Sequence, residues 1–199
     1  QAVPDRVIAA TNGANTSITF SGSTPEGAPW IYLETVGGGS GARAGKDGLD
    51  GVQVHMTNTS NLPAEALETE YPLKLLRYEL VDGSGGAGQF RGGMALRRVY
   101  RAEAACRVRI DSSRLRSAPW GLGGGADGSR AVIESGNLPY DHGTVLMQPG
   151  QVLSMLTAGA GGYGPPARRD PAMVARDVAE GRISREAAKA AYPQATLGT

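Results

Sequence analysis

Cysteine and histidine are scarce in this 199-residue sequence: Cys106 is the single cysteine, and His55 and His142 are the only histidines. One thiol cannot form an internal disulfide, and no CxxC pair is present to hold a metal. The two histidines lack the HxH or HxxxH spacing with which one element chelates a metal, so we expect no complete metal centre in these residues. We expect Cys106 to be a buried structural thiol, and its isolation fits a reducing cytoplasm.

Excess charge of one sign and long apolar runs are also missing. The 20 basic residues are balanced by 19 acidic ones, which gives no basic face for nucleic acid or an anionic membrane. No apolar run approaches the roughly 20 residues that span a bilayer, and the N-terminus has no signal-peptide pattern. We therefore expect a soluble cytoplasmic protein with neither partner. Because the sequence starts at Gln1 directly in a strand-and-turn pattern, we also expect it to be a fragment of a longer chain.

Glycine, by contrast, is abundant, with 30 residues, and such a number indicates many positions of positive φ or close backbone approach. Residues 37–51 are too rich in glycine for regular structure, and we expect a long loop. Consecutive backbone N–H groups there could cradle a phosphate. However, Gly45-Lys46 lacks the upstream glycine and the following Ser or Thr of a P-loop, and no GxGxxG opens a helix. The pattern favours a close-packed structural loop over a nucleotide site, and contact with a ligand stays open.

The remaining pattern predicts an α+β fold, predominantly β, with strand layers packed as a sandwich or barrel and a few short helices. Strands are expected at 18–20, 30–33, 52–56, 75–80, 94–100, 106–110, 131–134, 143–147 and 151–156, with a short helix from Pro63 to about Tyr71. Asp170 before Pro171, and Ser184, are helix N-caps that predict a C-terminal helical hairpin, with Gly181 between the helices. We divide the chain into a glycine-rich segment, 1–72, a β-rich domain, 73–166, and a helical tail, 167–199.

Directional polar groups are concentrated between residues 46 and 68. The stretch contains Asp47, Asp50, His55, Asn58, Asn61, Glu65 and Glu68. In a functional interpretation His55, on a strand, transfers protons, and the asparagine amides hold a carbonyl or carboxylate. In a structural interpretation Asn58 and Asn61 are turn and cap residues, and Glu65 favours a helix N-terminus. The two interpretations weigh equally for His55, and the structural one is favoured for the glutamates.

Several motifs follow one another in a specific order. They are Tyr32-Leu33-Glu34-Thr35-Val36-Gly37-Gly38-Gly39, Gly45-Lys46-Asp47-Gly48-Leu49-Asp50-Gly51-Val52, His55-Met56-Thr57-Asn58-Thr59, Asn61-Leu62-Pro63-Ala64-Glu65, Arg77-Tyr78-Glu79-Leu80, Gly85-Gly86-Ala87-Gly88-Gln89-Phe90-Arg91-Gly92-Gly93 and Ala118-Pro119-Trp120-Gly121-Leu122. Together they resemble the C-terminal third of hydantoinase B proteins, from about residue 1 to Gly164. The closing helices also look like the usual end of such a protein.

The resemblance implies a larger enzyme. In this family ATP with Mg is held by an A-type ATPase subunit, which phosphorylates a carbonyl oxygen, while the B-type part completes ring opening or carbon–carbon bond formation. A divalent transition metal such as Mn, Zn or Fe is held by the N-terminal portion of the B-type component, which this chain lacks. The chain would then supply one wall of the site, with His55 and Glu34 as catalytic residues and Asn58, Asn61 and Asp47 as substrate-binding residues.

Three hypotheses stay open at this point. The first is the B-type component of an ATP-dependent cyclic amide hydrolase of N-methylhydantoinase or 5-oxoprolinase type. The second is the equivalent component of an ATP-dependent ketone carboxylase that acts on acetone or acetophenone. The third is a non-catalytic piece that only supports a partner chain. Motifs in this region do not separate the first two.

Overall fold

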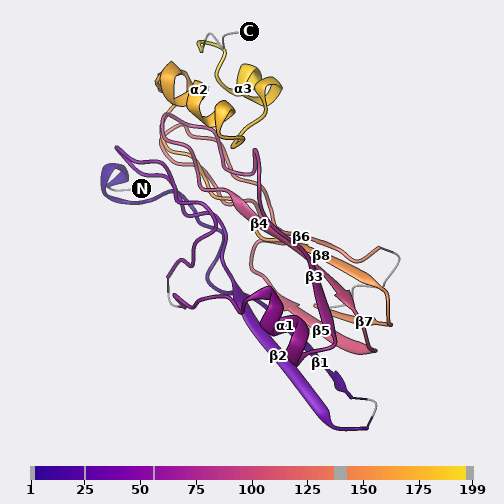
Figure 1. Cartoon of the computed structure of the whole chain (residues 1–199). Helices are drawn as coiled ribbons and strands as arrows, with labels where there is room; N and C mark the ends of the chain where they lie inside the picture. Colours follow the sequence, from indigo (N-terminus) through magenta and orange to yellow (C-terminus); the bar gives the residue numbers. More distant parts are fainter. Residues whose placement is uncertain (1–2, 25, 56, 137–142, 196–199) are drawn as a thin grey trace.

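The computed structural model describes residues 3–24, 26–55, 57–136 and 143–195, and within them eight strands form two antiparallel sheets (Figure 1). The first sheet has the order β2 (Pro29–Val36), β1 (Thr16–Ser23), β5 (Cys106–Asp111) and β7 (Thr144–Met147). The second has the order β3 (Leu73–Val81), β4 (Ala95–Ala102), β8 (Val152–Leu156) and β6 (Val132–Glu134). The expected α+β class with dominant β structure is confirmed.

The two sheets enclose one apolar core, so the strand layers form a sandwich. β5 alternates strictly between buried and exposed residues, as its period-two sequence predicts. Its inward residues Val108 and Ile110 lie in the same cluster as Phe20 of β1 and Leu153 of β8. Burial of such side chains contributes roughly 1.5–3 kcal/mol each, which makes this cluster the main source of stability in the sandwich.

The short helix α1 (Ala64–Glu70) lies beside β3 and buries Leu67. It starts after Pro63, as expected, and ends at Tyr71, whose extended backbone leads into β3. The Tyr71 ring contacts Tyr32 and Trp30 of β2, with centroids 5.0 and 6.0 Å apart. These aromatic contacts tie α1 to the first sheet.

The glycine-rich segments form a bundle of extended chains between the sandwich and the C-terminal helices (Figure 1). We call residues 9–12, 37–42, 47–51, 84–93, 119–128 and 157–164 the glycine bundle. Neighbouring segments exchange backbone hydrogen bonds: Ala9 N–H donates to Ala42 O at 2.8 Å, and Ala42 N–H donates to Gly161 O at 3.1 Å. A Cβ on Gly39 would lie 2.1 Å from Gly93 O. Glycine is needed here because the chains approach too closely for any side chain, which confirms a close-packed structural role for residues 37–51.

Two helices close the chain. Two short 3-10 helices are also present, η1 (Pro4–Arg6) near the start of the chain and η2 (Pro166–Arg168) directly before the first of the closing helices. α2 (Pro171–Ala179) is capped by Asp170, whose side chain accepts from Ala172 N–H, and α3 (Arg185–Ala191) by Ser184, which accepts from Ala187 N–H. Val174 and Tyr192 meet in a small apolar cluster of their own. Both caps and the helical hairpin are confirmed.

Buried charges join these helices to the glycine bundle. The ionic cluster comprises Asp47, Asp50, Arg91, Arg169, Asp177 and Arg182. Arg169, whose side chain is 0% exposed, donates to Asp47 at 2.8 Å and to Asp177 of α2 at 2.6 Å. A buried guanidinium requires such partners, because a lone charge in the interior costs several kcal/mol.

The expected strand at 52–56 is wrong. Only Val52 makes a bridge, to Gly38. Gly51, just before the expected strand, and His55, within it, have φ of +58° and +78°, which are not extended backbone conformations. Met56, the last residue of that expected strand, and His142 lie outside the described residues. The division at residues 72 and 166 stays a prediction, although β1 and β2 share a sheet with β5 and β7.

Among the described helices, none has the length and apolar character to cross a membrane.

Candidate functional site

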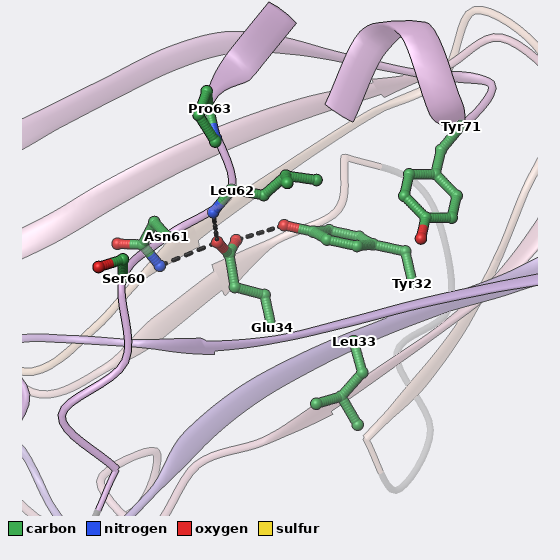
Figure 2. Close-up of a pocket in the computed structure, with 8 residues that line it drawn as sticks. All are labelled: Tyr32, Leu33, Glu34, Ser60, Asn61, Leu62, Pro63 and Tyr71. Atoms are coloured by element: carbon green, nitrogen blue, oxygen red, sulfur yellow. Dashed lines mark hydrogen bonds between the residues drawn. The ribbon is translucent and has the colours of Figure 1, made fainter. Parts of the chain in front are cut away.

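A cavity of about 380 Å³ opens between β2 and the segment that precedes α1 (Figure 2). We call it the β2 cavity. Its lining consists of Tyr32, Leu33, Glu34, Ser60, Asn61, Leu62, Pro63 and Tyr71. Two residues predicted for the site from the sequence, Glu34 and Asn61, therefore lie together on one wall.

The Glu34 carboxylate is 7% exposed and accepts four hydrogen bonds. One oxygen accepts from Asn61 Nδ2 at 2.9 Å and from Leu62 N–H at 2.8 Å, as Figure 2 shows. The other accepts from the Tyr32 hydroxyl at 2.5 Å and from the Arg98 guanidinium. Arg98, 1% exposed, also lies over the rings of Tyr78 and Tyr100 at 4.5 and 5.4 Å. The two buried charges are matched and hydrogen-bonded to each other, while Arg98 Nε has no acceptor among the described residues.

The neighbours of Glu34 are themselves held in place. Burial raises the pKa of Tyr32, with Tyr100 adding to the rise and Arg98 opposing it, so the hydroxyl keeps its proton and donates to Glu34. Asn61 donates to Glu34 and to Thr35 O, and its Oδ1 accepts from the Tyr78 hydroxyl at 2.6 Å. This wall is consequently a fixed polar network in which each of these groups has a partner.

His55 and Asn58 lie in the exposed segment between the glycine bundle and α1. They line neither the β2 cavity nor a second cavity, described below, that is lined by Asp47. Their φ values, 78° and 42°, are the only positive ones at non-glycine positions in the described chain. The left-handed conformation costs such residues roughly 1–2 kcal/mol. His55 Nε2 lies 3.1 Å from Thr11 Oγ1 of the glycine bundle. Strain at His55 supports a functional hypothesis for this segment, whereas the left-handed conformation at Asn58 fits the turn role expected of an asparagine.

Asp47 lies apart from Glu34, at a second cavity of about 190 Å³ that shares no lining residue with the first. Burial would raise the pKa of Asp47, but its hydrogen bonds and attraction to Arg169, together with the backbone N–H of Arg91, lower it. Its carboxylate is therefore ionised and occupied by a guanidinium. The structure brings Glu34 and Asn61 together and leaves Asp47, His55 and Asn58 elsewhere.

Sequence reasoning missed Arg98, although a signal for it was present. In the run Leu96-Arg97-Arg98-Val99-Tyr100, the period of two places Arg98 on the same face as the apolar Leu96 and Tyr100. A charged residue on the inner face of a strand predicts a buried counter-ion. That partner, Glu34, lies 64 positions earlier in the chain.

The described residues do not fit a metal centre. No group of three or more His, Cys, Asp or Glu side chains among them is arranged to hold an ion. The half-buried carboxylates of Asp47 and Asp50 and the buried carboxylate of Asp177 are already bound by arginines. Cys106 is confirmed as a buried thiol, and burial raises its pKa to about 11, which keeps it protonated.

The sandwich with its glycine bundle and helical tail defines the class of protein, because the whole arrangement recurs in a solved enzyme. The crystal structure of ATP-dependent caprolactamase from Pseudomonas jessenii matches 100% of this chain with a TM-score of 0.78 and 28% identity, over 37% of that chain. The chain belongs to the hydantoinase B/oxoprolinase family, whose model matches residues 1–166.

Relatives of this family resemble nearly the whole chain. An uncharacterized protein of Methanocaldococcus jannaschii is 41% identical over 95% of this chain and 34% of its own length. The B subunit of a putative D-/L-hydantoinase from Pseudomonas sp. (strain NS671) is 34% identical over 96% of this chain and 33% of its own length. The chain thus spans about a third of the length of each of these two relatives.

Proposed function

We propose that this chain is the C-terminal part of the B-type component of an ATP-dependent enzyme that hydrolyses cyclic amides. The observation that carries the proposal is the match of all its residues to part of a caprolactamase that is described as ATP-dependent. The similarity to the B subunit of a putative hydantoinase supports the same reaction class. Both names refer to enzymes that open a cyclic amide.

The proposal places the chain in the cytoplasm, within a larger assembly. An A-type ATPase subunit would bind ATP with Mg, and the N-terminal portion of the B-type component would hold a divalent transition metal such as Mn, Zn or Fe. The hydantoinase relative is one subunit of its enzyme, which supports a partner of this kind. The described residues of this chain offer no ligand set for that metal.

Within the assembly, this chain would provide one wall of the substrate site. Glu34 stays a predicted catalytic residue, but the four donors around its carboxylate favour a positioning role in which it orients Asn61 at the β2 cavity. The Asn58 amide would hold a carbonyl or carboxylate of the substrate, and Asn61 would do the same by releasing one of its two donated hydrogen bonds, to Glu34 or to Thr35 O. Asp47 stays a predicted substrate-binding residue at the second cavity, and to bind substrate directly its carboxylate would have to release Arg169.

His55 is the proposed proton-transfer residue. Its imidazole is exposed, and the only bond it makes within the described chain is to the Thr11 hydroxyl. An exposed imidazole on a strained backbone is free to meet a substrate or a partner chain, which a buried one is not. The amide nitrogen that leaves a ring-opened substrate needs a proton, and an imidazolium can donate one.

The test isolates the tagged chain from its native cells with the polypeptides that remain bound and measures ATP hydrolysis. Hydantoin, 5-oxoproline and caprolactam are offered in one series, and acetone with bicarbonate in another, with the isolated chain as control. We expect a cyclic amide to stimulate ATP hydrolysis in the assembly and none of the compounds to do so with the isolated chain.

Two outcomes would contradict the proposal. Stimulation only by ketone and bicarbonate would identify a carboxylase component. An assembly that responds to no substrate would favour the non-catalytic role, and a chain that binds no partner would contradict both the catalytic and the supporting role.

A further inference from the structure

The hairpin at residues 43–46 carries two cations that face the same way. Arg43 N–H donates to Lys46 O and Lys46 N–H donates to Arg43 O, both at 3.1 Å, around the two-residue tip Ala44-Gly45. Residues directly opposite in such an antiparallel pair project their side chains to the same side. Both line the second cavity, of about 190 Å³.

These two cations have no counter-ion within the described chain. Arg43 and Lys46 are both exposed, and neither forms an ion pair with another described residue. Like charges directly opposite each other on a hairpin destabilise it. Asp47, the adjacent carboxylate, cannot neutralise them because Arg169 and the Arg91 N–H occupy its oxygens. The cavity therefore has an uncompensated positive charge.

The rest of the lining adds a hydroxyl group and apolar surface. The Ser40 hydroxyl oxygen accepts from Leu49 N–H at 2.7 Å, which leaves its own proton available to donate. Gly41 also lines the cavity, and its N–H has no acceptor among the described residues. Ile8 and Leu49, 46% and 51% exposed, present large apolar side chains at the same place. In the lining of this cavity, hydrogen-bond donors and cations thus outnumber free acceptors, and they lie beside the apolar side chains of Ile8 and Leu49.

We propose that the cavity between Arg43, Lys46, Ser40 and Leu49 is a binding site for a small organic anion, with a carboxylate or phosphoryl group on the cations and an apolar body against Ile8 and Leu49. Both head groups accept charge-assisted hydrogen bonds from arginine and lysine. The residues around Gly45-Lys46 lack the P-loop pattern that binds the phosphate chain of a nucleotide. A ligand with a single anionic head group is consistent with that sequence.

The site is tested on the 199-residue chain alone, without ATP or partners, so the result is independent of the proposed enzyme activity. The backbone amides of Gly41, Gly45 and Leu49 are followed by NMR at low salt during titration with inorganic phosphate and, separately, with hexanoate. We expect saturable shifts that are confined to this cavity. Tighter binding of phosphate would assign a phosphoryl ligand, and tighter binding of hexanoate would assign a carboxylate.

The double variant Arg43→Gln/Lys46→Gln should weaken binding at least about tenfold, because it removes both charge-assisted contacts. Its urea midpoint should stay equal or rise, because the repulsion between the two cations is gone. Arg107→Gln removes an exposed arginine from the outer face of β5 and should leave binding within about twofold of the original. Shifts that do not saturate, equal losses in both variants, or a clear loss of stability in the double variant would each overturn the proposal.

Discussion

At the scale of single residues, the buried pair of Glu34 and Arg98 tests whether the β2 cavity wall is held by charge. Glu34→Gln leaves the Arg98 guanidinium buried without a counter-ion, and we expect a loss of about 3–5 kcal/mol in the free energy of unfolding by urea. Adding Arg98→Met to it should recover part of that loss.

Glu103→Gln is the matched control, because Glu103 pairs with Arg101 at the surface, where both side chains are about two-fifths exposed. That change should cost at most about 1 kcal/mol. If Glu34→Gln proved as mild as the control, the pair would not be the structural centre of the wall, and a directly catalytic Glu34 would gain support.

Substitution of His55 distinguishes a role of its imidazole in turnover from a role in folding. We expect His55→Ala to lower the turnover number of the assembled enzyme far more than it lowers the melting temperature, because the exposed ring makes one hydrogen bond. His55→Gly should also lose turnover while the chain becomes more stable by up to about 1 kcal/mol, because glycine accepts a φ of 78° without strain. Unchanged turnover with a clearly lower melting temperature would support a structural His55.

Individual residues show what the sequence could and could not give. Asp170 and Ser184 were predictable as helix caps because a cap depends on its own few neighbours. Arg169 and Asp47 bind each other across 122 positions, and no local pattern encodes that distance. Glu34 was chosen from a motif, whereas its partner Arg98 was missed because only the folded sheets bring β2 and β4 together.

At the scale of elements, strands were predictable where one face is buried and one is wet, as in β5, because alternation is visible in a single sequence. The expected strand at 52–56 failed because Gly51 and His55 adopt positive φ, which the polar and apolar alternation does not reveal. The glycine bundle could be expected only as loops. Its order comes from lateral bonds between segments far apart in the chain, such as Ala10 with Gly161.

The glycine bundle yields an element-scale prediction. Gly39→Ala would place a Cβ 2.1 Å from Gly93 O and 2.8 Å from Ala160 N, both backbone atoms that cannot rotate away. We expect a loss of at least about 3 kcal/mol, or no folded protein at all, since overpacking here must separate hydrogen-bonded chains. The measurements are the yield of folded protein and the urea midpoint.

Gly83→Ala is the control, because Gly83 has a φ of +66° but no atom within 4 Å of the added Cβ. That variant should lose only about 1–2 kcal/mol, through backbone strain alone. Equal midpoints for the two variants would show that close approach at Gly39 costs no more than positive φ at Gly83, which would contradict the close-packed role of the bundle glycines.

At the scale of the whole molecule, the helical tail and the rest of the chain form one unit despite the end of the family match at residue 166. Arg169, Asp177 and Arg182 all lie beyond that point, yet they bind Asp47, Asp50 and Arg91 within the matched region. Arg91 also donates to Gly92 O inside the glycine bundle. The tail therefore completes the charge balance of the bundle, and acid should loosen both together.

The pH dependence of stability tests this coupling. The pKa of Asp47 is lowered below its ordinary 3.8 in the folded chain, so its contribution is fully present above about pH 4 and is lost as pH falls through the lower folded value. At pH 7, Asp47→Asn should cost about 3 kcal/mol, because Arg169 stays buried with one carboxylate fewer. As the pH falls below about 4 and through the lowered folded pKa of Asp47, the original chain should lose stability faster than the variant, so that their urea midpoints converge.

Asp111→Asn provides the comparison, because Asp111 pairs with Arg109 on the exposed face of β5, and its removal should change the midpoint little at any pH. If instead Asp47→Asn kept the same deficit in acid as at neutral pH, the ionised carboxylate could not be what stabilises the junction. Convergence, combined with simultaneous loss of the α2 amide signals and the Gly92 amide signal, would show that the tail and the glycine bundle unfold as one body held by the ionic cluster.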